Sequence, residues 1–398
     1  DGPVVCPDCC YCETCCTRFY DLYGQEPPRE EDWTNPMYKH FINFREQSMA
    51  EFLRDARDAV HEVNPEGVIF LNAGGWHGGA WRVARDIAAV GPYQNFNGAE
   101  AFYHLNRETP TLFWSLSAKH LVASGKPAIV FVHHCLGAWH YLPLPEIELK
   151  VSAAQTVACG AGTWQAVFDY SLDNSPVETV APMRDINGFL RKCEPYCTAA
   201  KSAATIALLY SGQSAKYYLS QLDELFTDVD ATIEQDLTLR SGSGEKIVNW
   251  TARKNRCDLW QGATYEGWFS ALTRQHIPFD VILDAGLLDG SLERYDTLII
   301  GNASCLSVEQ KKAIVQFVKE GGNLIAEAES GRYDELGDFT YQNLSELLGY
   351  TEIAGAFVPA TGEEYVDLGA ADHAVLGQFS AGQWLPRPVN ALQVTPTA

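Results

Sequence analysis

Residues 297–326 read TLIIGNASCLSVEQKKAIVQFVKEGGNLIA, and this stretch sets the fold class. Thr297–Ile300 is a short apolar run typical of a buried strand, and Asn323–Ala326 is a second one that follows a Gly-Gly turn. Between them, Ser307–Glu320 has the pattern of a helix, with its first serine in the N-cap position. Strand, helix and strand in succession predict an α/β unit with parallel strands.

The segments on either side extend this unit into a small doubly wound sheet over residues 199–350. Upstream, the pattern predicts a strand at Thr205–Ser211, a helix at Thr264–Gln275 and a strand at Phe279–Leu283. Ser241–Gly244 is expected to be loop. Beyond residue 350 the signals change to short strands and turns, so residues 351–398 are expected to begin a β-rich segment.

The first half of the chain has the same alternation of strands and helices. Pro36–Asn64 carries apolar residues at helical spacing and stops at an Asn-Pro boundary. Strands are expected at Gly67–Asn72, Gln94–Ala101, Ala128–His133 and Gly162–Phe168, and helices at Trp81–Val90, Thr111–Ala123, Pro145–Cys159 and Val177–Arg191. Four strand–helix repeats follow the opening loop. With a strand that ends just before Asp1 in an upstream segment, they predict strands four to eight of a truncated (β/α)₈ TIM barrel, the expected catalytic domain, over residues 1–198.

Bulk composition limits the classes of function. The chain has 398 residues, of which 46% are hydrophobic and 20% charged, as in ordinary globular proteins. Its net charge of -22 and its lack of a basic run make nucleic acid an unfavourable partner. No apolar run is long enough to span a membrane. The chain opens at Asp1 without an initiator Met or signal peptide, so we expect it to be cut from a longer one, and its localisation stays open.

The residues that follow the strands are the candidates for chemistry, because barrel active sites lie at the carboxyl ends of the strands. In order along the chain they are Asp1, Asn72, Glu100, His133, His134 and Asp169, with Trp76, Trp139 and Trp164 beside them. Glycoside hydrolysis needs two carboxyl groups that flank one sugar. We expect Asp1 and Glu100 to be that pair, with Asp169 as the reserve acid. The alternative for both is an ordinary exposed turn or loop carboxylate.

The opening loop CPDCCYCETCC places six cysteines at positions 6, 9, 10, 12, 15 and 16. Cys10, Cys12 and Cys15 have a spacing that suits three thiolate ligands of a structural zinc ion, with the fourth from Cys6, Cys9, Cys16 or a segment upstream. Cys6, Cys9, Cys12 and Cys16 also match the spacing of a bacterial iron–sulfur loop, although no proline follows the last cysteine. Free or disulfide-bonded thiols are a third alternative.

The second domain carries no evident chemistry of its own. Cys305 follows a strand, but the glycine-flanked elbow of a nucleophile is absent, so we expect a small buried side chain. No glycine-rich phosphate loop occurs in the chain. Such a domain is expected to serve contact between subunits.

These motifs resemble a known group of enzymes. The CxCxxC run at Cys10, Cys12 and Cys15, followed by Phe19 and a helix, is similar to the zinc loop after strand four of family 42 β-galactosidases. The segments YEGWFSAL, IPFDVI, YDTLII and FVKEGGNLIA, within Tyr265–Asp334, resemble the flavodoxin-like (class I glutamine amidotransferase-like) trimerisation domain of those enzymes. The opening DGP with its cysteines is closer still to an uncharacterised barrel group called hypothetical glycosyl hydrolase 6.

The resemblance implies a glycosidase that assembles as a homo-oligomer, with a trimer as the expected state, and that needs no cofactor for catalysis. In the family 42 pattern, glutamates end strands four and seven. This chain has Asp1 and His133-His134 there, and an aspartate ending strand four is similar to the nucleophile of the fucosidase and α-galactosidase clans. We therefore expect a retaining glycosidase with Asp1 as nucleophile and Glu100 as general acid/base. Asn72, His133, His134, Trp76, Trp139 and Trp164 would bind the sugar. The competing interpretation is a catalytically inactive carbohydrate-binding or assembly protein.

Overall fold

The structure is a computed structural model of the chain. It describes residues 10–72, 80–103, 109–136, 142–167, 177–227, 229, 248–357, 364–369, 377, 379–387 and 391–397. Asp1, Trp76, Trp139, Asp169 and the expected loop at residues 241–244 lie outside the described residues.

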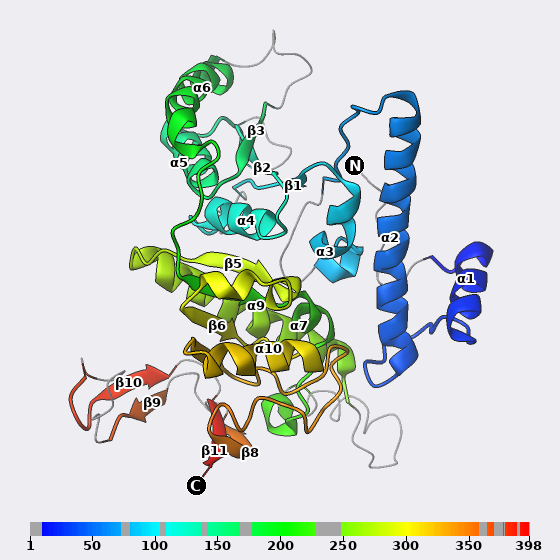
Figure 1. The fold of residues 1–398 in the computed structure, drawn as a ribbon, viewed down its shortest axis with the longest axis vertical. Coiled ribbons are helices and arrows are strands. Elements are labelled where there is room, and N and C mark those ends of the chain that lie inside the picture. Colours follow the sequence, from blue (N-terminus) through cyan, green and yellow to red (C-terminus); the bar gives the residue numbers. More distant parts are fainter. Residues whose placement is uncertain are drawn as a thin grey trace.

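The first half of the chain forms a parallel three-stranded sheet covered by helices, at the top of Figure 1. Its strands are β1 (Asn97–Ala99), β2 (Ala128–His133) and β3 (Gly162–Ala166), in that spatial order. The helices α4 (Phe113–Val122), α5 (Glu146–Ala158) and α6 (Val177–Cys197) alternate with them. Apart from shorter first and last strands and a longer last helix, this is the succession that the sequence predicts.

Two expected elements differ from the prediction. Gly67–Asn72 forms only an isolated parallel bridge from Asn72 to Gly98, because the side-chain oxygens of Asn95 and Gln94 accept the N–H groups of Ile69 and Leu71. These side chains accept the hydrogen bonds that the backbone of a neighbouring strand would otherwise accept. The helix expected at Trp81–Val90 is broken into a 3₁₀ turn, Ala80–Val83, and the short helix α3, Ile87–Val90. Ala84 has a φ of 53°, in the left-handed region, which ends the first turn.

The second half contains a parallel four-stranded sheet in the order β5-β4-β6-β7. Its strands are β4 (Ile206–Tyr210), β5 (Asp280–Leu283), β6 (Thr297–Gly301) and β7 (Asn323–Glu327). The long helix α9 (Trp250–Arg274) packs on one face and α10 (Val308–Lys319) on the other. The predicted start of α10 is confirmed in detail, since Ser307 and Gln310 form a reciprocal capping box. Shorter elements are α7 (Gly212–Tyr217) and 3₁₀ turns at Gly91–Tyr93, Asp223–Phe226, Asp284–Leu287 and Ser291–Arg294.

One continuous hydrophobic core joins the two sheets. Leu116 and Leu121 of α4 belong to the same buried cluster as Leu208 of β4, Val281 of β5 and Phe269 of α9. The carboxylate of Asp280, at the start of β5, also lies 3.9 Å from Lys119 of α4. The first half therefore packs on the α9 face of the second sheet, as Figure 1 shows.

The N-terminal segment packs along both halves. Helix α1 (Glu13–Tyr23) lies outermost, and α2 (Pro36–Val63) is the long helix at the right of Figure 1. Asn35 caps α2 by accepting the N–H of Met37, as expected for a helix that starts with proline.

A buried ionic cluster fixes α2 against the second sheet. Lys216 of α7 donates to Glu46 of α2 and to Asp86 at the N-cap of α3, each at 2.7 Å. Burial raises the pKa of Glu46 to about 7, whereas the ammonium of Lys216 keeps the pKa of Asp86 low despite its burial. The pKa of Lys216 is raised well above its usual value by the two carboxylates, which outweigh its own burial.

Around Cys305, the carboxyl end of the second sheet is filled by protein. Trp33, Trp81 and Cys305 belong to one buried cluster there, and the fully buried ammonium of Lys254 lies 5.0 Å and 5.4 Å from the rings of Trp33 and Trp81. This edge is where doubly wound sheets usually bind ligands. Burial also raises the pKa of the Cys305 thiol well above its usual value, in agreement with a packing role.

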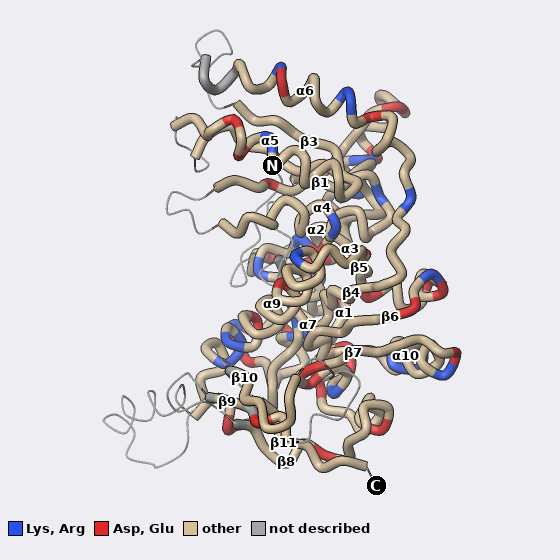
Figure 2. The backbone as a smooth tube through the Cα atoms, turned by 90° about the vertical axis from the view of Figure 1, so that its left-hand side faces the viewer, with Lys and Arg blue, Asp and Glu red and all other residues tan. Residues whose placement is uncertain are grey.

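The C-terminal residues form two antiparallel pairs, β8 (Tyr350–Phe357) with β11 (Ala391–Pro396) and β9 (Glu364–Asp367) with β10 (Trp384–Arg387). Figure 2 shows lysine and arginine dispersed along the tube among acidic residues. Among the helices that the structure describes, none has the length and apolar character needed to cross a membrane.

Candidate functional site

The candidate site lies where neighbouring parallel strands end. Asn72 bridges to Gly98 of β1, and β1, β2 and β3 are neighbours in the sheet. Asn72, Glu100 and His133 therefore lie at the carboxyl ends of adjacent segments. Asn72 Nδ2 donates to Glu100 Oε1 at 2.6 Å. The structure thus brings together two residues that the sequence predicts for one site.

Arg85 supports this pair from the turn before α3. Its Nη1 donates to the backbone oxygen of Asn72 at 2.9 Å. Burial lowers the pKa of Arg85, and the charge of Glu100 acts in the opposite direction. Sequence reasoning missed Arg85, because an arginine in an expected helix carries no signal that separates it from a solvent-exposed one.

The two histidines at the end of β2 point to opposite faces of the sheet. The His133 ring stacks on Phe131, two residues earlier, with centroids 5.6 Å apart, so these side chains share a face. His134 contacts Gln165, which in turn bonds Asn187 of α6, on the helix-covered face. His133 therefore lies on the face opposite the one that His134 and α6 occupy.

The surroundings of His133 favour its neutral ring. Its Nδ1 donates to the backbone oxygen of Cys135 at 2.8 Å, which assigns the proton to Nδ1 because a carbonyl only accepts. Burial lowers the pKa of His133, and the neighbouring Glu100 charge opposes that shift. A neutral imidazole at this place can accept a hydrogen bond from a hydroxyl group, but it cannot replace a carboxylate nucleophile at neutral pH.

Trp164 lies below the strand ends in an aromatic cluster. It pairs with Phe131 in the β2–β3 register, and its ring meets those of Phe131 and Phe70 edge-on at 4.8 and 5.7 Å. Gly98 makes room for this cluster, because a Cβ there would lie 2.8 Å from Phe70. Through its contact with Phe131, Trp164 lies on the same face of the sheet as His133.

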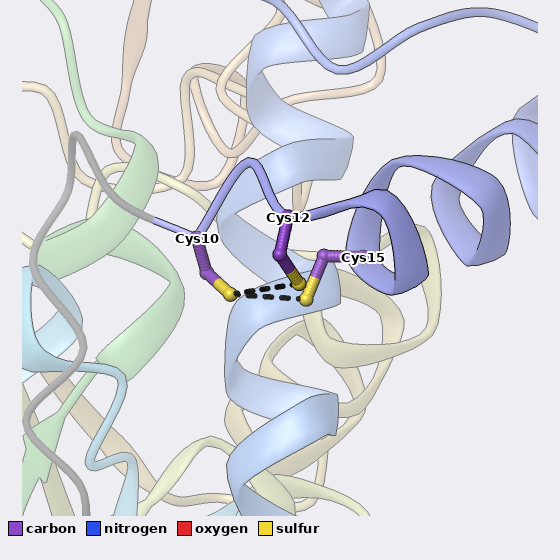
Figure 3. A group of neighbouring side chains, drawn as sticks. All are labelled: Cys10, Cys12 and Cys15. Carbon is purple, nitrogen blue, oxygen red and sulfur yellow. Dashed lines mark hydrogen bonds between the residues drawn. The ribbon is translucent and has the colours of Figure 1, made fainter.

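A second candidate site is the cysteine group at the start of α1. Figure 3 shows the side chains of Cys10, Cys12 and Cys15 turned toward one another. Cys10 Sγ lies 3.7 Å from Cys12 Sγ and 3.1 Å from Cys15 Sγ. Sulfurs on one tetrahedral zinc ion are separated by about 3.8 Å, so small movements would suffice. Among the described residues, Cys16, which the iron–sulfur spacing requires, is not part of this group.

The comparisons with known proteins agree with the fold. The fold is similar to that of solved glycosidase chains. A β-galactosidase from Bacillus circulans sp. alkalophilus aligns over 98% of this chain and 59% of its own length, with a TM-score of 0.68 and 14% sequence identity. A β-galactosidase from the haloarchaeon Halorubrum lacusprofundi aligns over 97% of this chain and 59% of its own length, with a TM-score of 0.66 and 14% sequence identity. An α-L-fucosidase from Paenibacillus thiaminolyticus aligns over 99% of this chain and 49% of its own length, with a TM-score of 0.62 and 16% sequence identity.

A more particular likeness lies in the second half. Residues 242–361 match the sequence model of the β-galactosidase trimerisation domain, so this part of the chain is similar to such enzymes in sequence as well as in fold. The chain spans about 59% of the length of the first β-galactosidase structures that it matches. A search of curated proteins finds no match.

Proposed function

We propose that the intact protein is a glycoside hydrolase that cleaves O-glycosidic bonds with retention, using Glu100 as general acid/base and Asp1 as nucleophile. The observation that carries this proposal is the carboxylate of Glu100, oriented by Asn72 at the carboxyl end of parallel strands in a glycosidase fold. Oxygens of a sugar would find donors and acceptors in Asn72 and His133, above the ring of Trp164.

The fold assignment behind this proposal is a barrel. β1, β2 and β3 would be strands six, seven and eight, and the segment ending at Asn72 would be strand five, with residues 1–198 as the catalytic domain. Residues 199–350 would be the flavodoxin-like domain, since the order β5-β4-β6-β7 corresponds to the first four strands of that topology. Residues 351–398 would begin the β-rich segment.

The test of the proposed function uses the intact protein and a panel of nitrophenyl glycosides that includes β-D-galactoside and α-L-fucoside. We expect release of nitrophenol from at least one of them, and a first sugar product of unchanged anomeric configuration by proton NMR. Folded protein that releases nothing from the panel would contradict the proposal.

The second candidate is a non-catalytic carbohydrate-binding or assembly protein. It is favoured by one observation: a buried, neutral His133 stands near the place where family 42 enzymes carry a glutamate. Binding of sugars without turnover, measured by calorimetry in the same panel, would support this candidate over the enzyme.

We further propose a structural zinc ion on Cys10, Cys12 and Cys15. Zinc would tie the start of α1 to the segment before it, since thiolate ligation supplies folding energy. Purified protein is expected to contain about one zinc per chain, and Cys12→Ser to lower that content, whereas the distant control Cys193→Ser should not. Elemental analysis that finds iron, or no metal in protein prepared without chelator, would refute the assignment.

Finally, we propose a homo-oligomer, with a trimer as the expected state, assembled through the second domain. β7 is an edge strand of its sheet, and Ile325 on it is 40% exposed. Ile325→Lys is expected to shift the intact protein toward monomer in light scattering at micromolar concentration. Ile277→Lys, an equally exposed position three residues beyond the last residue of α9, is the matched control. A monomeric wild-type protein would defeat this proposal.

A further inference from the structure

A cavity of about 840 Å³ lies between the loop that leads into α4 and the helix α9. Six of the residues that line it are Glu100, Phe102, Phe113, Glu266, Ser270 and Arg274. Its volume is in the range of small-ligand pockets, roughly 300–1,000 Å³. The cavity therefore joins the carboxyl end of β1 to the second domain of the same chain.

The α9 wall presents polar groups in one row. Glu266, Ser270 and Arg274 are four residues apart, so they lie on one side of the helix. Arg274 Nε donates to Ser270 Oγ at 3.0 Å, and burial raises the pKa of the Glu266 carboxyl. Within the described part of the chain, neither Glu266 nor Arg274 forms an ion pair, so both have capacity to bind a ligand.

The opposite wall is aromatic and hydroxylated. Phe102 and Phe113 are half-buried, and Thr109 and Thr111 lie between them in sequence. The cavity thus combines apolar ring faces with a cationic donor, Arg274, and an anionic acceptor, Glu266. This combination suits a neutral polyhydroxylated molecule, because such a molecule has apolar C–H faces and hydroxyl groups at its edges. A strongly anionic ligand would meet Glu100 and Glu266 and be repelled.

The cavity opens beside the proposed acid. Glu100 lines it directly, and the ring of Phe102 lies 6.3 Å from that of His133. A general acid donates its proton to the leaving oxygen, so the leaving group must lie on the side of that acid. A cavity lined by the acid itself offers room for the departing sugar beside that acid.

We propose that this cavity binds the sugar on the leaving-group side of the scissile bond, so that α9 of the second domain forms a carbohydrate subsite in the same chain. This inference rests on the proposed function, since it assigns Glu100 as the acid. It gives the second domain a part in substrate recognition that is separate from subunit contact.

Gly267 offers a direct test. It lines the cavity within α9, and a Cβ added there meets no atom within 4 Å, so Gly267→Leu fills the cavity without a clash of its first side-chain atom. Gly262, on the same helix, also has open space at Cβ but is not part of the cavity wall, which makes Gly262→Leu the matched control. Gly267 also borders a neighbouring crevice near Trp268, whereas Ser270 does not, so Ser270→Leu is the second test variant.

The measurement is kcat/KM for lactose divided by kcat/KM for β-D-galactosyl fluoride, whose leaving group is a single atom. If the glycoside panel selects fucosides, fucosylgalactose and α-L-fucosyl fluoride take their place. We expect this ratio to fall about tenfold or more in Gly267→Leu and Ser270→Leu, and to stay at the wild-type value in Gly262→Leu. A ratio that is unchanged in the two test variants, or equally lowered in the control, would overturn the subsite.

Failure of the proposed function would be visible separately, as no hydrolysis of any glycoside or fluoride. Calorimetric titration of the intact protein with the disaccharides then tests whether the cavity binds sugar, independently of catalysis. Binding by wild type and Gly262→Leu that is lost in Gly267→Leu supports the subsite. Equal binding by all three proteins, or binding by none, overturns it.

Discussion

Glu100→Gln is expected to lower kcat/KM of the intact protein by roughly 10²–10⁴-fold, the usual contribution of a general acid/base. The amide can still accept the hydrogen bond from Asn72 Nδ2, so the change removes the proton without removing the contact that orients the side chain. The loss should be greatest for leaving groups of high pKa, such as alkyl alcohols and sugars. It should be smallest for dinitrophenyl glycosides, which depart without protonation.

Glu62→Gln, an exposed carboxylate near the end of α2, is the control and is expected to retain wild-type kinetics. A Glu100→Gln protein with wild-type activity on both kinds of leaving group would remove Glu100 from the mechanism. The acid would then have to be sought at Asp169. A uniform loss on all leaving groups would point instead to a role in binding the substrate.

Lys216→Met is expected to lower the free energy of unfolding by about 3–5 kcal/mol, because it leaves the buried carboxylates of Glu46 and Asp86 without their shared cation. The measurement is chemical denaturation at pH 7.5, followed by circular dichroism. Lys150→Met removes an exposed lysine paired within α5 and should leave the midpoint unchanged. An equal midpoint for wild type and Lys216→Met would show that the cluster does not hold α2 in place.

The pH dependence of this variant has a definite sign. Without Lys216, burial and mutual repulsion hold the folded-state pKa values of Glu46 and Asp86 above their unfolded values. The folded state then binds more protons than the unfolded state, so Lys216→Met should regain stability as the pH falls from about 8 toward 5. Adding Glu46→Gln should restore part of the stability at pH 7.5, since one of the two uncompensated charges is removed.

Much of the secondary structure could be predicted from the sequence because its signals are local. Asn35 before proline starts α2, Ser307 and Gln310 cap α10, and the apolar run Ala128–His133 forms β2 with the expected bounds. Where prediction failed, a side chain or a single backbone angle intervened. The Gln94 side chain accepts the Leu71 N–H group that a neighbouring strand would otherwise bind, so residues 67–72 do not form the expected strand. The left-handed backbone angle of Ala84 interrupts the expected helix.

The candidate site could be predicted only in part. The rule that polar residues follow barrel strands selected Asn72, Glu100 and His133, and the structure brings Asn72 and Glu100 into contact. The rule could not choose between His133 and His134. Adjacent residues of a strand face opposite sides of the sheet, and only the packing of α6 decides which side is covered. Asp1, the proposed partner of Glu100, lies outside the described residues, so their separation stays a prediction.

Local sequence patterns alone predict the α/β class, the Ser307 cap of α10 and the grouping of Cys10, Cys12 and Cys15, because these depend on neighbours within a few residues. The tertiary structure decided what depends on residues far apart in the chain. Lys216 meets Glu46 across 170 positions, and α9 reaches the loop before α4 to close a cavity beside Glu100. Such contacts arise from the shared core between the two sheets, which no local pattern specifies.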